Sequence, residues 1–440
     1  MKRLFAALLA GLALLSLPAA AGAIEIKQVT TPLGIKAWLV EDKSTPVVAL
    51  SFSFVGGTAS DPAGLSGTTD LMANLLTDGA GPLNAQAFRQ RQEDAAASIS
   101  FSASLDRVNG SLRVLSANRD EGFELLRLAM VEPRFDAAMV DQRRAQTIAS
   151  LNQAAQRPAS VAGRTLMATL FAGHPYAADP EGTREDLAKV TPDHLKKRAA
   201  AVLLRSGLTV AAVGDISEAE LARQIDRAFG SLPAGTPPAL PPQWVPPTKP
   251  RTVVVERPVP QSAALMALPG IPRDDPDWYA ALVMNHVLGG GGQQSRLFNE
   301  VREKRGLAYS VSSGLRTYKR AALLVISTGS ANERIAEALR VIKANMARLR
   351  TEGITEQELS DAKTYLAGAL ALSLDSSGSI ANLLHAMQVD GLSPDHLTKR
   401  GALIAAVKLE DVHKMARRLL RDEALTTVVV GKPVGVTSEP

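Results

Sequence analysis

The spacing of apolar residues changes along the chain from a period of two to a period between three and four. Leu50, Phe52 and Phe54 alternate with serines, and a similar alternation surrounds residue 101, as in half-buried strands. Between residues 332 and 353 apolar side chains recur every three or four positions, as in an amphipathic helix. Strands followed by runs of helices predict an α+β fold, with helices packed on one face of a mainly antiparallel sheet.

The sequence contains an internal repeat that relates its two halves. The segment Leu208-Thr-Val-Ala-Ala-Val-Gly214 reappears in the second half of the chain as Leu425-Thr-Thr-Val-Val-Val-Gly431. Ser116-Ala-Asn118 returns as Ser330-Ala-Asn332, at nearly the same separation. A single long-period repeat predicts two homologous α/β sandwich domains in tandem, not a short-period solenoid.

A proline-dense segment separates the two copies. It includes Pro-Pro-Ala-Leu-Pro-Pro-Gln-Trp-Val-Pro-Pro, which is too rich in proline for a helix or a central strand and favours an extended linker. The predicted units are an N-terminal domain (24–236), a Pro-rich linker (237–250) and a C-terminal domain (251–440).

The first residues have the pattern of a secretory signal. Lys2 and Arg3 precede an apolar run over residues 4–17, and small residues end at Ala23. The run is shorter than the roughly 20 residues that a membrane span needs, which disfavours an uncleaved anchor. We expect cleavage after Ala23, a periplasmic mature protein, and no stable membrane insertion afterwards.

Composition narrows the chemistry. The chain has 49 Lys+Arg against 44 Asp+Glu, and only 4% of its residues are aromatic. It therefore has neither the strong positive charge nor the aromatic surface for stacking bases that nucleic-acid binding requires. Cysteine is absent, which excludes disulfides, thiolate nucleophiles and cysteine-based metal sites. Any chemistry must use His, carboxylates, hydroxyls, Arg or Lys.

One motif resembles that of a known protein family. Gly64-Leu-Ser-Gly-Thr-Thr-Asp-Leu-Met72 follows a predicted strand and opens a helix. It resembles the corresponding helix of the pitrilysin and insulinase family of zinc peptidases, the inverzincins, which reads G-L-x-H-x-x-E-H-M. Further resemblances follow in the family's order, at His174-Pro-Tyr176, Val213-Gly-Asp215 and the segment 295–311. The resemblance covers essentially the whole mature chain.

The zinc ligands of that family are missing. Matching the helix places Gly67 and Leu71 where the two ligating histidines stand and Asp70 where the general-base glutamate stands; the third ligand falls near Ser150. No two of the six histidines lie three or four positions apart. Catalytic zinc needs three protein ligands, so we expect no metal and no cofactor in this chain. Asp70 is interpreted as a solvated or hydrogen-bonded side chain, and His174 as a histidine that fixes a turn.

The second half retains what the family uses around the scissile bond. The resemblance implies that Arg302 and Tyr309 bind the peptide and stabilise the tetrahedral intermediate, as donors to a developing oxyanion. From the spacing alone, a solvated arginine and a tyrosine packed at a strand start are favoured; the family resemblance favours the functional interpretation. A glycine run precedes them, and similarity to the non-catalytic subunit of mitochondrial processing peptidase suggests a substrate-binding loop; a helix terminator is the alternative. The run is Gly289, Gly290, Gly291 and Gly292.

Three functions follow as hypotheses. In the first, the chain is the non-catalytic, substrate-binding subunit of a periplasmic heterodimeric zinc peptidase that degrades peptides, with zinc in a homologous partner subunit. In the second, it is a degenerate scaffold or peptide-binding protein, as the core subunits of the cytochrome bc complex are degenerate peptidase relatives. The third, a serine acyl enzyme using Ser360 and Lys363, has the S-x-x-K spacing but lacks the accompanying motifs.

Overall fold

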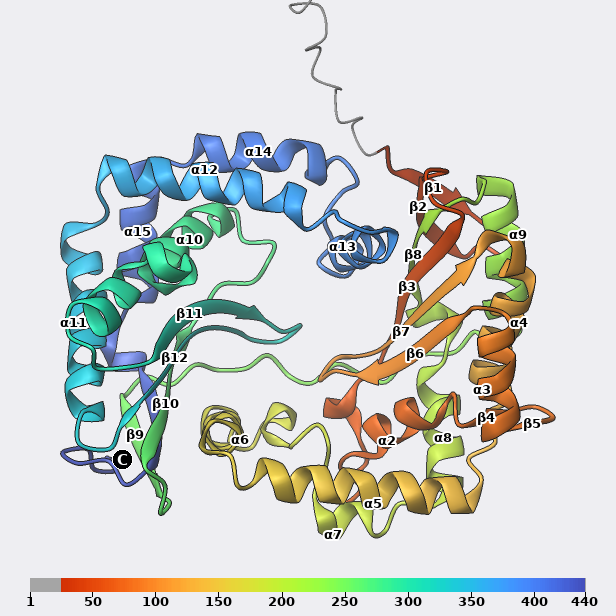
Figure 1. Cartoon of the computed structure of the whole chain (residues 1–440), viewed down its shortest axis with the longest axis horizontal. Helices are drawn as coiled ribbons and strands as arrows, with labels where there is room; N and C mark the ends of the chain where they lie inside the picture. The colour runs from red at the N-terminus through yellow and green to blue at the C-terminus, as the bar shows by residue number, and fades with distance from the viewer. Residues whose placement is uncertain (1–24, 440) are drawn as a thin grey trace, which may run out of the picture.

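The computed structural model describes residues 25–439, so the predicted signal peptide (1–23) lies outside the described residues. Two sheets, each flanked by helices, form the two halves of the molecule (Figure 1). The strands of the N-terminal sheet are, in spatial order, β1 (Lys27–Thr30), β2 (Lys36–Glu41), β8 (Thr209–Gly214), β3 (Val47–Val55), β7 (Arg107–Leu115) and β6 (Ser98–Ala103).

The second sheet repeats the first. Its spatial order is β11 (Ser310–Thr317), β12 (Ala322–Ala331), β10 (Gln261–Pro269), β13 (Thr426–Gly431) and β9 (Arg251–Glu256). Each sheet has one parallel pair, β2 with β8 and β9 with β13, and the other pairs between its strands are antiparallel. Read from the parallel pair outward, β2-β8-β3-β7-β6 corresponds to β9-β13-β10-β12-β11. The predicted tandem of two homologous, mainly antiparallel domains is confirmed.

Helices surround both sheets (Figure 1). Those in the first half are α2 (Thr68–Leu75), α3 (Ala85–Asp94), α4 (Arg119–Val131), α5 (Ala137–Ala154), α6 (Pro158–Leu170), α7 (Arg184–Leu187), α8 (Pro192–Val202) and α9 (Glu218–Phe229), with a small hairpin of β4 (Gly79–Ala80) and β5 (Leu83–Asn84). Those in the second half are α10 (Trp278–Asn285), the π-helical turns η5 (His286–Gly290) and η7 (Phe298–Glu303), α11 (Ile335–Glu352), α12 (Glu356–Leu372), α13 (Ser377–Val389), α14 (His396–Ala406) and α15 (Leu409–Leu419).

The two domains exchange helices. In Figure 1, α13 lies beside β3 and β8 of the N-terminal sheet, and it packs Leu384 and Met387 against Val40 and Val213. Reciprocally, α6 packs on β10 and β13 of the C-terminal sheet. Each sheet therefore has its own helices on one face and a helix of the other domain on the opposite face.

This exchange corrects one prediction. The alternation along residues 50–54 predicted a strand with one polar, solvated face, but Ser51 and Ser53 of β3 are 6% and 0% exposed. The apolar face packs in the core, where Phe52 contacts Phe101 and Phe229 edge to face. The serine face is buried because α13 covers it, a contact that no local pattern contains. In β6, by contrast, the predicted alternation of buried and exposed residues is confirmed.

The segment between the sheets is extended. Within residues 233–250 there is no helix or strand. Trp244 anchors it: the side chain is 7% exposed, lies against Phe171, and donates from Nε1 to the carbonyl oxygen of Leu170 at 3.0 Å. Among residues 25–439, no helix combines the length and apolar character needed to cross a bilayer.

Candidate functional site

The start of α2 is where the family resemblance places the zinc helix. Gly67 caps this helix in a left-handed conformation (φ +86°), and Leu71 is 1% exposed in the core. Ser150 lies on α5, which packs on α2, but its side chain is exposed. These side chains do not fit a zinc ion, since none of them offers a ligating atom at the site. Within residues 25–439 no group of three or more His, Asp or Glu side chains is placed to hold a metal.

A carboxylate that the sequence motifs did not single out organises this region instead. Asp61 accepts hydrogen bonds from the backbone N–H groups of Gly67 (2.9 Å) and Thr69 (3.1 Å), so it satisfies free donors at the start of α2. Arg198 of α8 lies 3.7 Å from Asp61 and donates to the carbonyl oxygen of Gly57 at 2.9 Å. An aspartate shortly before a helix start was the available signal. The network fixes the loop and helix without a metal.

Asp70 is hydrogen-bonded, as interpreted from the sequence. Its Oδ2 accepts from Nδ2 of Asn74 at 3.0 Å. Burial raises the pKa of Asp70 to about 6, and the charge of nearby Glu181 acts in the same direction. A carboxylate with a raised pKa and no metal or second acid–base partner at hydrogen-bond distance among the described residues provides no complete catalytic constellation.

The His-Pro-Tyr segment joins the two domains. Nδ1 of His174 accepts from the backbone N–H of Tyr176 at 3.1 Å, which is the turn-fixing role expected for this histidine. Tyr176, which is 0% exposed, donates its hydroxyl hydrogen to Asp106 in the turn between β6 and β7. Asp106 also accepts from the backbone N–H of Lys319, in the hairpin between β11 and β12, at 2.9 Å. The motif is therefore part of the interdomain junction.

Arg302 and Tyr309 lie together. The Arg302 guanidinium is 5.0 Å from the Tyr309 ring centre and 4.8 Å from that of Phe298. Tyr309 is 82% exposed and the Arg302 side chain 38% exposed, so the alternative of a packed tyrosine is wrong. Apart from a 3.8 Å approach of Arg302 to Glu303, neither side chain has a hydrogen-bond or ion-pair partner in the described structure. Both present donors to the surface.

The glycine run ends a helix. Gly289 and Gly290 close the π-helical turn η5, and a Cβ at Gly289 would come within 2.8 Å of the Ser313 backbone. Of the four glycines, Gly292 alone has both a left-handed φ (+58°) and open space around it. Its carbonyl oxygen accepts from Ser295 at 2.7 Å, at the start of the segment that carries Arg302. The terminator alternative describes the conformation, while contact with substrate stays a prediction.

The structure does not support the serine acyl-enzyme hypothesis. Lys363 donates from Nζ to the carbonyl oxygen of Ala405 on α14 at 2.8 Å, and no hydrogen bond among the described residues links it to Ser360. The hydroxyl of Thr364 donates to the Ser360 backbone. A serine without a base at hydrogen-bond distance is not activated.

The candidate residues thus form two separate groups. Arg302, Tyr309 and the glycine run belong to the C-terminal domain, and η7 packs on β11 there. The degenerate metal positions belong to α2 and α5 of the N-terminal domain. Within one chain, the donor pair and the former metal position do not build one site.

Family models match both halves. Residues 36–184 match the insulinase model (peptidase family M16), and residues 189–366 match the model described as the peptidase M16 inactive domain. The chain belongs to the M16 peptidase family. The resemblance inferred from the motifs is therefore confirmed, and the matched residues include strands of both sheets.

Two curated proteins and one solved structure are similar to this chain over most of its length. The chain is 28% identical to the non-peptidase homolog YmxG of Helicobacter pylori, over 81% of this chain and 82% of that one. It is 25% identical to an uncharacterized zinc protease of Streptomyces coelicolor, over 90% and 87% of the respective chains. A solved M16 inactive domain from Pseudomonas fluorescens superposes with a TM-score of 0.88 at 29% identity, covering 94% of this chain and 99% of that chain.

Proposed function

We propose that this M16 protein is the non-catalytic, substrate-binding subunit of a heterodimeric zinc metallopeptidase that degrades peptides. A homologous partner subunit supplies the zinc and the general base, and this chain supplies Arg302 and Tyr309. The observation that carries the proposal is the exposed pairing of these two donors, with the guanidinium 5.0 Å from the ring centre, in a chain whose metal positions hold Gly67, Leu71 and Ser150.

The exposure of the pair supports a role in contact with another molecule. A tyrosine ring that is 82% exposed contributes little to the core of its own domain. The cation–π contact with Arg302 is worth about 0.5–1 kcal/mol at an exposed site, which favours the side-by-side arrangement roughly two- to fivefold. A guanidinium and a phenol hydroxyl together can donate to a peptide carbonyl as it becomes an oxyanion.

The chain's own residues have defined tasks in this scheme. Arg302 and Tyr309 orient the peptide and stabilise the charge that develops on its carbonyl oxygen. No catalytic step takes place at the start of α2 in this chain, because the side chains there cannot ligate zinc. Peptide recognition by backbone pairing with an exposed sheet edge would add affinity without requiring one side-chain pocket. The signal pattern that begins at Lys2 and Arg3 supports a periplasmic location for the complex.

The test is to measure peptide hydrolysis by this chain alone, by a zinc-bearing M16 homologue encoded next to it, and by the mixture, with zinc determined for each. Activity only in the mixture, with zinc only in the homologue, is expected. Arg302→Ala or Tyr309→Phe then lowers turnover of the mixture by about 10²–10³ without preventing assembly. Arg316→Ala, on the exposed end of β11, and Tyr365→Phe, on the surface of α12, are matched controls expected to leave turnover unchanged.

A scaffold or peptide-binding role is the second candidate, favoured by the likeness to a relative named a non-peptidase homolog. In that case mixing gives no gain in hydrolysis, and both substitutions are silent. Co-purification of the two chains separates a failure to assemble from an absence of complementation.

A further inference from the structure

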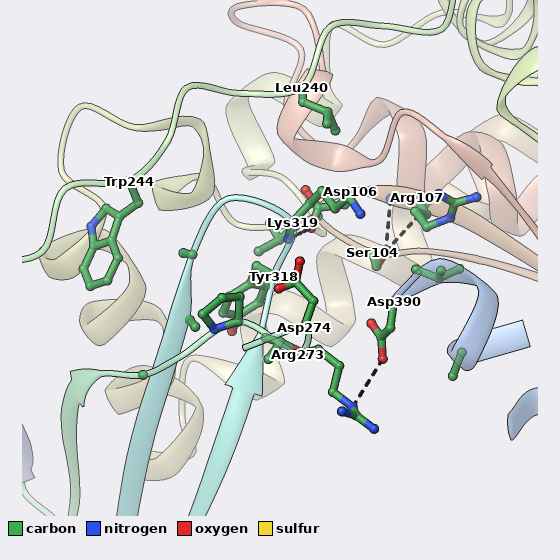
Figure 2. Close-up of a pocket in the computed structure, with 18 of the residues that line it drawn as sticks. Ser104, Asp106, Arg107, Leu240, Trp244, Arg273, Asp274, Tyr318, Lys319 and Asp390 are labelled. Atoms are coloured by element: carbon green, nitrogen blue, oxygen red, sulfur yellow. Dashed lines mark hydrogen bonds and ion pairs between the residues drawn. The ribbon is translucent and has the colours of Figure 1, made fainter. Parts of the chain in front are cut away.

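A cavity of about 950 Å³ lies in the seam between the two domains, here called the seam cavity (Figure 2). Its walls come from the β6–β7 turn of the N-terminal domain, the linker, the loop after β10, the β11–β12 hairpin and the end of α13. This volume is at the upper end of the range for sites that enclose drug-sized ligands, and such sites occur preferentially at domain interfaces. No sequence motif indicates the cavity, because its walls come from segments of both halves of the chain, from Val55 to Asp390.

Two carboxylates line the cavity without full compensation. Asp274, in the loop after β10, is exposed and has no hydrogen bond or ion pair with the described residues, so water solvates its charge when the cavity is empty. Asp390 ends α13 and has only Arg273 at 3.9 Å. Burial raises the pKa of Asp390, and the charge of Asp274 raises it further, while Arg273 and Lys319 oppose the shift. Two carboxylates whose charges act on each other would together attract a further cation.

A cation faces the same space. The ammonium group of Lys319, at the tip of the β11–β12 hairpin, forms no ion pair with residues 25–439, although its backbone N–H is held by Asp106. Figure 2 shows Lys319 beside Asp106 and Arg107, with Asp274 between this group and Arg273. Arg107 adds positive charge on the same side; its guanidinium donates to Ser53 and Thr209 but pairs with no carboxylate of the described chain. An anionic group here would be attracted by both cations, against the opposing charge of Asp106, which lines the same wall.

The remaining wall is apolar and aromatic. Trp244 and Tyr318 line it, together with Leu240, Pro246 and Val389. The cavity thus combines two carboxylates whose one ion pair within the described chain is the 3.9 Å contact of Asp390 with Arg273, a lysine without an ion-pair partner there, and an apolar surface. A ligand that matches all three carries a positive and a negative end with apolar groups between them.

We propose that the seam cavity binds short apolar peptides with free termini, the α-ammonium group lying between Asp274 and Asp390, the α-carboxylate at Lys319, and the side chains against Trp244 and Tyr318. This site is distinct from Arg302 and Tyr309, which do not line the cavity. It needs neither the zinc-bearing partner nor hydrolysis, so it goes beyond the proposed function and is tested on this chain alone.

The experiment is isothermal titration calorimetry of the full chain with the tripeptide Leu-Ala-Phe and three capped forms of it: N-acetylated, C-amidated and doubly capped. Removing one charged hydrogen-bonding group weakens binding by roughly tenfold or more, and removing both weakens it further. Equal affinity for all four forms would overturn the proposal, as would no binding of the free tripeptide with a Kd below about 1 mM.

Variants assign each terminus. Asp274→Asn should weaken the free tripeptide roughly tenfold but leave the N-acetylated form unaffected, because both changes remove the same contact. Lys319→Met should act in the same way towards the C-amidated form. Asp375→Asn and Lys343→Met, both exposed and not in the cavity lining, are the matched controls and should change nothing. Additive losses in either cycle would show that the terminus lies elsewhere.

A blocking variant tests the location independently. Ala386 is exposed on α13 and lines the cavity, so Ala386→Trp fills the space without entering the core. Binding should be lost while the far-ultraviolet circular dichroism stays unchanged. Retained binding by a folded Ala386→Trp protein would place the peptide at another site. Failure here leaves the Arg302 and Tyr309 assay untouched, and failure of that assay leaves this titration untouched.

Discussion

The hydroxyl of Tyr176 donates to the carboxylate of Asp106, and the same carboxylate accepts the backbone N–H of Lys319 from the other domain. Tyr176 is fully buried, with Phe171 packed edge to face on its ring. The backbone N–H of Arg320 donates to the tyrosine oxygen at 3.2 Å. One phenol oxygen thus connects the His-Pro-Tyr segment with the β6–β7 turn and the β11–β12 hairpin. The His-Pro-Tyr segment therefore stabilises the contact between the two domains.

Tyr176→Phe should therefore destabilise the protein. The substitution leaves Asp106 with one fewer donor and the N–H of Arg320 without its acceptor, at a cost of about 2 kcal/mol for a hydrogen bond to a charged group. Urea unfolding measures the loss, and Tyr365→Phe, whose ring is 53% exposed, should show none. Equal stability of the two variants would contradict the assignment of Tyr176.

The left-handed backbone conformation of Gly67 leads to a second prediction. A Cβ at this position would meet the carbonyl oxygen of Glu181 at 2.5 Å, so Gly67→Ala combines backbone strain with a clash and should cost about 3 kcal/mol. Gly64→Ala is the matched control: its φ is also left-handed (+74°) but no atom lies within 4 Å, so only the strain of about 1–2 kcal/mol remains. Thermal unfolding of both variants separates the two contributions. Gly67→His would carry the same strain and clash, so restoring one ligand residue does not restore a metal site.

Asp70→Asn should stabilise the protein at neutral pH. The pKa of Asp70 is raised by burial to about 6, above its ordinary value near 3.8, so its charged form is disfavoured in the folded state. The native chain therefore loses stability as pH rises from 4 through 6, and the variant does not. Above pH 6 the variant should gain about 1–2 kcal/mol, and below pH 4 the difference should vanish. Urea unfolding across this range is the measurement, with Asp375→Asn as a control expected to show no pH-dependent difference.

His385 gives the opposite pH dependence. Nε2 of this histidine forms a hydrogen bond of 2.6 Å with the hydroxyl of Ser53, whose oxygen also accepts from Nε of Arg107 at 2.6 Å. With Nε2 unprotonated, the histidine accepts the hydroxyl hydrogen of Ser53. Burial, with the charge of Arg107 second, lowers the pKa of His385 to about 4. The stability that depends on neutral His385 is complete above pH 6.5 and is lost as pH falls towards 4, by about 2–3 kcal/mol.

His385→Gln removes this titration while keeping an acceptor for Ser53, so its stability should fall less than that of the native chain between pH 6.5 and 4. His194→Gln is the control: His194 occupies the N3 position of the capping box that begins at Thr191, where glutamine is equally suited, and the variant should preserve the native slope. Parallel pH profiles for the native and His385→Gln proteins would refute the role given to this histidine.

The sequence by itself determined the repeat, the α+β class and the family. These follow from patterns that one segment, or two copies of it, contain: alternating Leu50, Phe52 and Phe54, the helix between residues 332 and 353, and the segment 208–214 that recurs as 425–431. The loss of the zinc ligands is also a sequence property, because Gly67 and Leu71 cannot ligate whatever surrounds them.

Tertiary structure decided what depends on contacts between distant segments. The burial of Ser53 requires α13, which belongs to the other half of the chain, and no local period reports such a partner. The hydrogen bond of Tyr176 to Asp106 and the charges gathered in the seam cavity arise in the same way. Short-range patterns specify which elements form and which face is apolar. The packing of the two domains specifies which polar groups of distant segments meet, and such groups line the seam cavity.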